Sequence, residues 1–226
     1  MTKRKNKPVE PCLVPQLVLT LDVRRDLNPL LFRQIIQTKS FACLILYDSQ
    51  ISQGDESFLQ KGAQLYIDDV QQSGAAFLIA DESRVVGRVK ADGLHVEEDS
   101  NLLKSLQNHK KEQKIIGCGN LKSRHAAMNV AETGVDYLMF GKLGADKKPQ
   151  AHGRNIQLAQ WWTEMMEIPA IIQAGADPEF FDETLETACE FIAIEEMIFS
   201  HDHPLNVLDR VKEKCKNFPV SSEKSY

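Results

Sequence analysis

The sequence lacks the segments that mark common cofactor and metal sites. It has no Gly-x-Gly-x-x-Gly segment and no Walker motif, so nothing in it indicates a nicotinamide cofactor or nucleotide hydrolysis. Its five cysteines are an odd number and include no Cys-x-x-Cys pair, which favours reduced thiols in a cytoplasmic protein over a disulfide framework. The pair His201 and His203 has no accompanying ligand set, so it does not predict a zinc site.

Long apolar runs and an excess of positive charge are also missing. No run approaches the roughly 18 apolar residues that a membrane-spanning helix needs, and the basic N-terminal segment lacks the apolar core of a signal peptide. A formal net charge of −5 is unlike that of a general nucleic-acid binder. We therefore expect a cytoplasmic protein with no membrane and no nucleic-acid partner, in which residues 1–14 and 218–226 are flexible tails.

What the sequence does contain is a series of eight short apolar runs. They are nearly continuous, as strands that are covered on both faces of a parallel sheet should be. The runs lie at residues 16–21, 41–47, 75–80, 91–96, 114–118, 135–140, 169–174 and 191–194. The predicted strand ends are therefore Leu21, Tyr47, Ala80, Val96, Cys118, Phe140, Ala174 and Ile194.

Segments with helical spacing of apolar residues separate these runs. Leu27, Leu31 and Ile35, for example, share one helix face before the second run, whereas residues 83–89 and 101–109 give the weakest helical pattern. This alternation predicts an α/β protein with a single-domain (β/α)8 TIM barrel over residues 15–217. An open doubly wound sheet is the alternative. In the barrel, a functional site is expected at the C-terminal ends of the strands.

A loop rich in lysine follows the sixth run. GKLGADKK, residues 141–148, contains Lys142, Lys147 and Lys148 directly after a predicted strand end. One interpretation is a solvated surface loop. The other is a binding site for an anion such as phosphate, because phosphates bind at this end of many barrels.

Five segments in order resemble the thiamine phosphate synthase family. They read ADGLHVEED (91–99), KIIGCGN (114–120), GVDYLMFGKLGADKK (134–148), IPAIIQAGAD (168–177) and FIAIEEMIF (191–199). The resemblance covers about residues 75 to 200, and the first 75 residues match only in strand layout. It implies a transferase of thiamine biosynthesis that couples a pyrimidine pyrophosphate to a thiazole phosphate and releases pyrophosphate. It also implies small phosphorylated ligands, Mg²⁺ and self-association.

The same resemblance implies roles for individual residues. Asp81 and Asp99 stand where the family holds Mg²⁺, although Asp99 is one residue closer to its strand than expected. Lys147 or Lys148 stands for the lysine that meets the pyrophosphate in catalysis. Gly175 matches a phosphate-binding glycine of the family. Gly119 stands where the family has a serine, whose hydrogen bond Asn120 can replace, and Lys142 is the fourth residue expected to bind phosphate.

Several positions depart from the family pattern. The cationic clamp after the second strand is absent, and Asp48 lies there instead. Ala80 and Ala174 replace an asparagine and a glycine, while Glu195 and Glu196 replace a small turn that holds phosphate. A carboxylate about 4 Å from a phosphate charge costs about 4 kcal/mol at an effective dielectric near 20. We therefore expect weak or lost activity.

Three functional hypotheses remain open. The protein retains the family reaction with a rebuilt rim, or it binds a different and less anionic ligand, or it is a non-catalytic partner or regulatory protein. Under the second hypothesis, an acidic cluster holds a metal or a cationic ligand. The alternative is that these residues form a solvated acidic rim. The cluster comprises Glu97, Glu98, Asp99, Glu195 and Glu196. Under the third, Trp161 and Trp162 contribute to an interface, the alternative being a tryptophan packed in the core.

Overall fold

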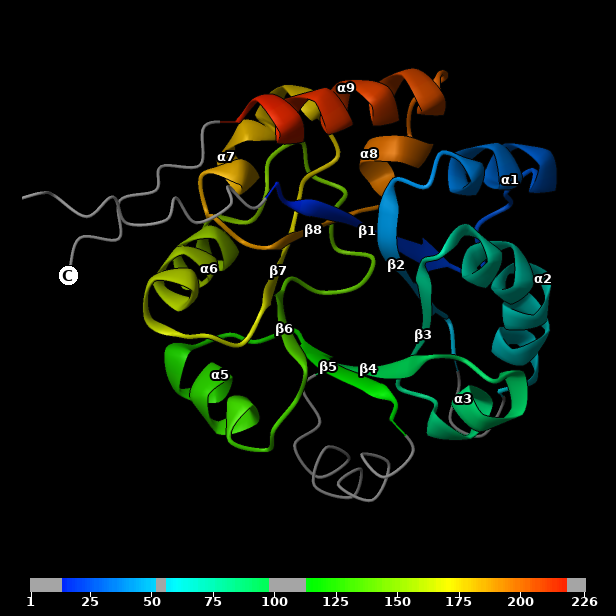
Figure 1. The fold of residues 1–226 in the computed structure, drawn as a ribbon, viewed down its shortest axis with the longest axis horizontal. Helices are drawn as coiled ribbons and strands as arrows, with labels where there is room; N and C mark the ends of the chain where they lie inside the picture. Colours follow the sequence, from blue (N-terminus) through cyan, green and yellow to red (C-terminus); the bar gives the residue numbers. More distant parts are fainter. Residues whose placement is uncertain (1–13, 52–55, 98–112, 219–226) are drawn as a thin grey trace, which may run out of the picture.

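The strands close into a barrel. In this computed structural model, which describes residues 14–51, 56–97 and 113–218, all neighbouring strands are parallel and β1 pairs with β8 (Figure 1). The strands are β1 (Gln16–Asp22), β2 (Phe41–Tyr47), β3 (Ala76–Ala80), β4 (Gly93–Glu97), β5 (Ile115–Gly119), β6 (Tyr137–Phe140), β7 (Ala170–Gln173) and β8 (Phe191–Ile194). Every predicted strand end is confirmed to within one residue. The open doubly wound sheet is therefore wrong.

Helices form a layer around the barrel (Figure 1). The longer ones are α1 (Pro29–Gln37), α2 (Ser57–Ser73), α3 (Ser83–Val89), α5 (Arg124–Ala131), α6 (Gly153–Met165) and α9 (Pro204–Asn217). The helix expected after the seventh strand is only a 3₁₀ turn, η2 (Pro178–Phe180), and one α-turn, α7 (Asp182–Leu185). An additional short helix, α8 (Glu196–Phe199), directly follows β8. The weak helix expected at 101–109 lies outside the described residues.

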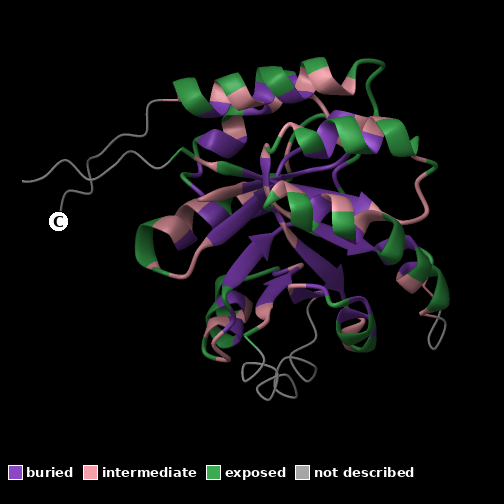
Figure 2. Ribbon diagram, turned by 45° about the vertical axis from the view of Figure 1, so that its right-hand side comes forward, coloured by how far each residue is buried: buried purple, intermediate pink, exposed green. Residues whose placement is uncertain are grey.

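Alternate strand residues fill two apolar clusters. One cluster lies between strands and helices and includes Leu44 and Phe140, and the other fills the barrel interior and includes Ile45 and Met139. This arrangement follows from the two-residue period of a strand, which points successive side chains to opposite faces. In Figure 2 the strands are accordingly almost entirely buried, and exposed residues lie on the outer helices. The continuous apolar runs reflect burial on both faces.

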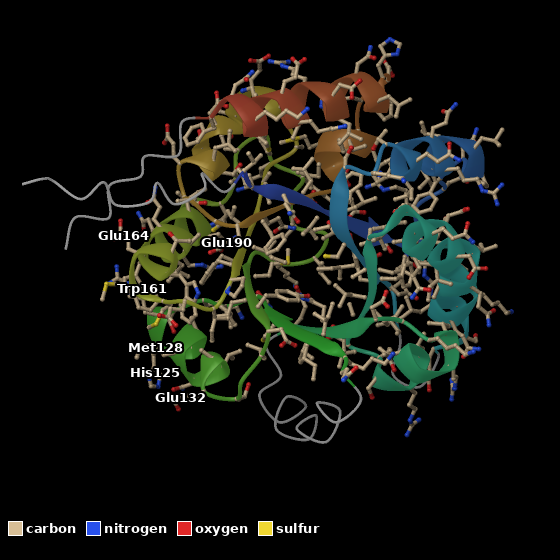
Figure 3. All side chains as sticks on the ribbon, viewed as in Figure 1. His125, Met128, Glu132, Trp161, Glu164 and Glu190 are labelled. Atoms are coloured by element: carbon tan, nitrogen blue, oxygen red, sulfur yellow. The ribbon has the colours of Figure 1, made fainter. Side chains whose placement is uncertain are left out.

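The adjacent tryptophans have different environments. Trp162 is fully buried, and its indole N–H donates to the carbonyl of Ile168 at 2.8 Å. Trp161 is only partly buried and lies beneath the guanidinium of Arg124 from α5, at 4.9 Å (Figure 3). Of the pair, Trp162 is therefore a core residue, and only Trp161 reaches the surface between α5 and α6. Among the described residues, no helix has the length and hydrophobicity to cross a membrane.

Candidate functional site

The loop after β6 covers the C-terminal mouth of the barrel. Leu143 is buried and packs with the apolar side chains of the barrel interior. Gly144 has a φ of +71°, and a Cβ there would lie 2.9 Å from the hydroxyl of Tyr47 on β2. In Figure 1 this loop lies inside the ring of strands. The lysine-rich segment is therefore not a simple connection on the surface, because part of it closes the barrel mouth.

Polar contacts from two strands fix the first half of this loop. The side-chain amide of Gln173, at the end of β7, accepts a hydrogen bond from Lys142 N at 2.9 Å and donates to Lys142 O at 2.7 Å. The carboxylate of Glu97, at the end of β4, accepts from Leu143 N at 2.9 Å. The backbone of the loop is held in place while the side chain of Lys142 is exposed.

The second half of the loop is fixed on the opposite side of the mouth. Asp146 is buried, and its Oδ2 accepts a hydrogen bond from the amide of Glu196 at the start of α8, at 2.9 Å. Burial raises the pKa of the Asp146 carboxyl. The Asp146 carboxylate therefore binds the backbone amide of Glu196 after β8, at the place where the resemblance implies the phosphate of a ligand.

A cavity of about 540 Å³ lies between this loop and the start of α6. Three of the positions expected to bind phosphate or pyrophosphate line it, namely Asn120, Lys142 and Lys148. Lys122 and Arg154 add two further cations to its wall. The structure therefore brings part of the expected anion site together, from the strand-five and strand-six loops and α6, and Gln173 and Ala174 at the end of β7 also line the cavity.

Gly175 is in close contact with the end of the strand-six loop. A Cβ at this position would lie 2.2 Å from the carbonyl oxygen of Pro149. The amides of Ala176 and Asp177 already donate to the carbonyls of Lys148 and Pro149, at 2.7 and 3.2 Å. The approach of an anion to the backbone beside Gly175 therefore requires displacement of the 148–149 segment. Pro178, which follows, begins only a three-residue 3₁₀ turn.

Gly119 makes room for a buried histidine. A Cβ on Gly119 would lie 2.6 Å from Nε2 of His95, whose Nδ1 shares a 2.8 Å hydrogen bond with the Tyr137 hydroxyl. Burial lowers the pKa of His95 to about 3, so the imidazole is neutral near pH 7. Asn120 follows with a φ of 56°, a left-handed conformation that asparagine tolerates, and its amide donates to Gly141 O at 2.7 Å.

The expected magnesium ligands are only partly described. Asp81 is exposed at the end of β3, and its Oδ1 accepts a hydrogen bond from Glu97 N at 2.8 Å. Asp99 and Glu98 lie outside the described residues. Within the described ranges, no group of three or more His, Cys, Asp and Glu side chains could hold a metal ion. Of the two expected ligands the structure describes only Asp81, a carboxylate of the kind that holds Mg²⁺ together with water and substrate phosphates.

Asp48 has a cationic partner that its neighbours in the sequence do not reveal. Arg24, from the loop after β1, donates to both carboxylate oxygens of Asp48 at 2.7 Å, and its guanidinium lies 3.8 Å from the ring centroid of Phe58. The Asp48 side chain is fully buried in this pair. Asp48 is therefore not an open negative charge at the rim, although Arg24 is engaged and does not restore the missing clamp.

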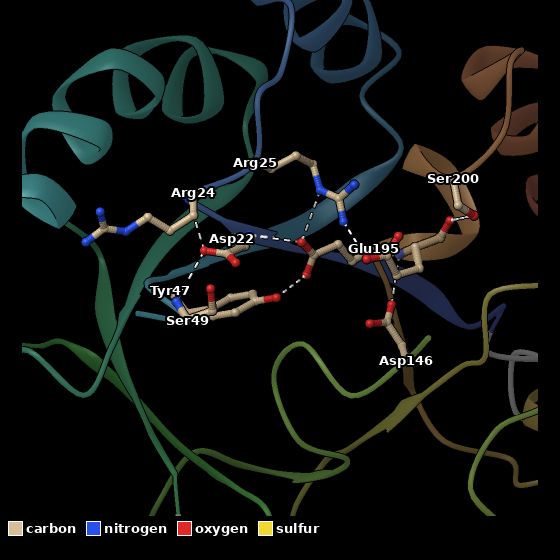
Figure 4. A network of polar contacts seen from close by, with 9 residues as sticks. Asp22, Arg24, Arg25, Tyr47, Ser49, Asp146, Glu195 and Ser200 are labelled. Atoms are coloured by element: carbon tan, nitrogen blue, oxygen red, sulfur yellow. Dashed lines mark hydrogen bonds and ion pairs between the residues drawn. The ribbon is translucent and has the colours of Figure 1, made fainter. Parts of the chain in front are cut away.

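Glu195 and Glu196 belong to a network rather than to an open acidic rim (Figure 4). Glu195 is 1% exposed and accepts hydrogen bonds from Asp22 N and the Tyr47 hydroxyl, each at 2.9 Å. Arg25 contacts both glutamates, at 3.5 Å for Glu195 and 2.7 Å for Glu196. Burial raises the pKa of Glu195 to about 7. The side of the mouth after β8 is consequently filled by the protein's own charged groups.

Sequence reasoning missed three residues that organise this site. Gln173, Asp146 and Arg25 each bind a loop or a strand end that is distant in the sequence. Gln173 gave a weak signal, since it is a polar residue within an otherwise apolar run. Asp146 and Arg25 lie in polar loops, where nothing local distinguishes them.

The fold and the site together define a class of protein. A closed (β/α)8 barrel with a lysine-bearing loop across its C-terminal mouth has the architecture of barrels that handle small phosphorylated molecules. The sequence model of one such family, described as thiamine monophosphate synthase, matches residues 31–198. The chain belongs to this family, which confirms the expected kinship and the single-domain barrel.

Individual relatives agree with this assignment. The chain is 30% identical to the thiamine-phosphate synthase of Erythrobacter litoralis over 130 residues, and 28% identical to that of Rhodospirillum centenum over 134 residues. The matches cover 56% and 58% of this chain, and 61% and 64% of the relatives. The chain therefore spans less than two thirds of the length of either relative.

Solved structures support the fold. The thiamine phosphate pyrophosphorylase of Pyrococcus furiosus is similar with a TM-score of 0.72 and 15% identity, over 90% of this chain and 96% of that one. The (S)-3-O-geranylgeranylglyceryl phosphate synthase of Thermoplasma acidophilum has a TM-score of 0.65 at 12% identity, over 90% and 94% of the chains. At these identities the likeness establishes the barrel fold alone.

Proposed function

We propose that this protein is a divergent transferase of the thiamine phosphate synthase type, with a turnover far below that of an ordinary family member. It couples a pyrimidine pyrophosphate to a thiazole phosphate and releases pyrophosphate. The observation that carries the proposal is the strand-six loop, which follows the same strand as in the family and is held across the barrel mouth with its three lysines exposed.

The residues act by stabilising charge and by positioning. Lys147 or Lys148 neutralises the departing pyrophosphate, and Lys142 and Asn120 hold phosphate oxygens. A ligand can approach the backbone at Gly175 only if the 148–149 segment moves, and His95 occupies the space beside Gly119. Magnesium, when bound, supplies further positive charge for the leaving group. Asp81 and Asp99 are the proposed ligands for it.

The low turnover follows from the contacts that the rim lacks. Removal of one preorganised charge contact commonly costs about 2.7–4 kcal/mol of transition-state stabilisation. Here the clamp after β2 is absent, Arg24 is engaged by Asp48, and Glu195 occupies the side of the mouth after β8. Turnover equal to that of an ordinary family member would require other cations to replace all of these contacts.

A steady-state assay tests the proposal. We expect purified protein, supplied with both substrates and Mg²⁺, to turn over more than about tenfold more slowly than an ordinary family member. Lys147→Ala and Lys148→Ala combined should abolish the remaining activity. Turnover comparable to that of an ordinary member would contradict the proposed loss. Activity that persists in the double variant would remove the lysines from catalysis.

A second candidate has one specific observation in its favour. The network of Glu195, Tyr47 and Arg25 lies after β8, where the resemblance implies a thiazole phosphate. Its carboxylate favours a family barrel that binds a less anionic ligand or only a protein partner. Calorimetry with thiazole phosphate and with the dephosphorylated thiazole separates the two. Tighter binding of the dephosphorylated compound would support the second candidate, and binding of the phosphorylated compound alone would support the first.

A further inference from the structure

We propose that the outer face of α5 and α6 is a docking surface for a second copy of this chain, in which the two α5 helices pack antiparallel about a two-fold axis at Met128. This α5–α6 face consists of Arg124, Met128, Glu132, Trp161 and Met165. Figure 3 shows Met128, Glu132 and Trp161 along one edge of the molecule, in the outer layer of helices. The inference does not rest on the proposed reaction, since association is measured without substrates.

Large apolar side chains are exposed in the middle of the α5–α6 face. Met128 on α5 is 44% exposed, and Met165 at the end of α6 is 66% exposed. Trp161 lies one helical turn before Met165, and its ring contacts the guanidinium of Arg124, so the two helices are neighbours. Methionine, tryptophan and arginine are enriched in protein–protein interfaces. Apolar side chains bordered by charges on adjoining helices therefore indicate an interaction surface.

The charges of α5 lie on either side of Met128 and have opposite signs. Arg124, the first residue of the helix, precedes Met128 by four positions, and Glu132, the C-cap residue, follows it by four. A spacing of four residues places the three side chains on one face of the helix, and all three are exposed. Neither Arg124 nor Glu132 forms an ion pair with another described residue. One end of this face is therefore cationic and the other anionic.

This order of charges is complementary to itself under two-fold symmetry. When two copies of α5 pack antiparallel with their Met128 side chains opposite each other, residues at equal distances before and after Met128 meet. Arg124 of each copy then faces Glu132 of the partner subunit, and two ion pairs flank the central methionines. A parallel arrangement would bring like charges together, so the charges select the antiparallel one. A second copy of the chain carries the complementary pattern without any further requirement, which makes it the partner that fits.

Arg124 is partly fixed before association. Its guanidinium lies 4.9 Å from the centroid of the Trp161 ring, a cation–π contact that restricts an otherwise exposed side chain. An ion pair between two flexible surface side chains usually gains little, because both lose rotamer freedom when they meet. Since the contact with Trp161 has already removed part of that freedom, the pair with Glu132 of the partner subunit forms at a lower entropic cost. Trp161 therefore holds Arg124 in place and borders the apolar centre of the surface.

Analytical ultracentrifugation of the full chain tests the surface. We expect the natural protein to form a concentration-dependent dimer and Met128→Lys to stay monomeric, because two ammonium groups would face each other at the two-fold axis. Leu65→Lys is the matched control, since Leu65 is 72% exposed on α2, and it should associate like the natural protein. Circular dichroism checks that both variants are folded. A natural protein that stays monomeric, or a dimer that Met128→Lys leaves unchanged, would overturn the proposal.

Charge reversal tests the antiparallel pairing. Arg124→Glu and Glu132→Arg each replace two attractive pairs by two repulsive ones, so each variant alone should weaken the dimer by about tenfold. An equimolar mixture of the two variants should recover most of the affinity, because opposite charges meet again at both ends of the mixed dimer. Such recovery excludes misfolding or net charge as the cause of the loss in either variant. A mixture that associates as weakly as its components, or single variants that associate like the natural protein, would overturn the antiparallel pairing.

Discussion

Glu195 carries a carboxylate into the barrel mouth, and its neighbours determine its charge. Burial raises its pKa to about 7, while the hydrogen bonds from Asp22 and Tyr47 and the nearby charge of Arg25 lower it in part. The pKa in the unfolded chain is lower, so between the two values the folded state binds more protons. The stabilisation is present below the unfolded pKa and is lost as the pH rises through about 7.

Glu195→Gln should remove this pH dependence. We expect the free energy of unfolding of the natural protein to fall by about 1–3 kcal/mol from the acidic to the alkaline side of this window, and the variant to show a flatter profile. Urea denaturation at a series of pH values measures both. Glu196→Gln is the matched control, since Glu196 is only partly buried, and it should keep the natural slope. Identical slopes in the Glu195 variant and the natural protein would contradict the prediction.

Gly119 is the residue that gives His95 its space. Gly119→Ala places a methyl group 2.6 Å from the imidazole Nε2, and the surrounding barrel is closely packed. We expect a loss of about 1–3 kcal/mol in the free energy of unfolding, measured by chemical denaturation. Gly87→Ala in α3 is the control, because its Cβ would meet no atom within 4 Å. That change should be neutral or stabilise by up to about 1 kcal/mol. Equal effects would exclude the steric explanation.

At the scale of elements, the strand-six loop lies across the barrel mouth and is held there by specific contacts. Leu143 fills the barrel mouth, and Gln173, Glu97 and the Glu196 amide hold the backbone around it. The loop has no secondary structure of its own between β6 and α6, so these tertiary contacts determine its conformation. Its position then decides where Lys142 and Lys148 lie relative to the cavity beside α6.

Leu143→Ala should destabilise the strand-six loop more than the rest of the barrel. The loop loses its apolar anchor while the strands keep theirs, so we expect faster amide hydrogen exchange in residues 141–148. The global free energy of unfolding should fall by less than the roughly 2–5 kcal/mol typical of a leucine in the core. Hydrogen-exchange mass spectrometry measures the local effect. Leu138→Ala, in β6 itself, serves as a control that should lower global stability. Unchanged exchange in the loop would contradict this prediction, because it would show that the polar contacts alone hold the loop in place.

At the scale of the whole molecule, closure of the barrel joins the two ends of the described chain. β1 pairs with β8, and the Asp22–Glu195 and Arg25–Glu196 contacts cross the same junction on the C-terminal side. No division into separate cores is present among the described residues, because each apolar cluster includes side chains from both halves of the barrel. The molecule should therefore unfold as one cooperative unit.

Denaturation curves that coincide for two different probes would verify that the barrel unfolds cooperatively. We expect the tryptophan fluorescence, to which Trp161 and the buried Trp162 both contribute, and the far-ultraviolet circular dichroism of the helices to change with the same midpoint in urea. Because Trp162 lies in the second half of the chain, an independent first half would give a separate transition by circular dichroism. Two distinct midpoints would contradict a single cooperative barrel.

The sequence by itself determined the barrel and the position of its lysine-rich loop. A strand buried on both faces appears in the sequence as a continuous apolar run, and a helix buried on one face appears as apolar residues at helical spacing. The strand ends could therefore be placed to within one residue. Kinship also followed from local segments in order. The expected magnesium pair, the roles of the individual lysines and self-association stay predictions, since they depend on ligands, on Asp99 or on a second copy.

Only the tertiary structure decided how the charged residues of the rim are used. Asp48 is paired with Arg24 at a separation of 24 residues, and Glu195 accepts from Asp22 N at a separation of 173. Such pairs leave no periodic signal, because they form only when barrel closure brings distant strand ends together. The same closure places Lys148 beside the start of α6 and Gly175 against Pro149. The chemistry of the rim is thus a property of the closed barrel, since the distances between its charges are set by strands that meet only after folding.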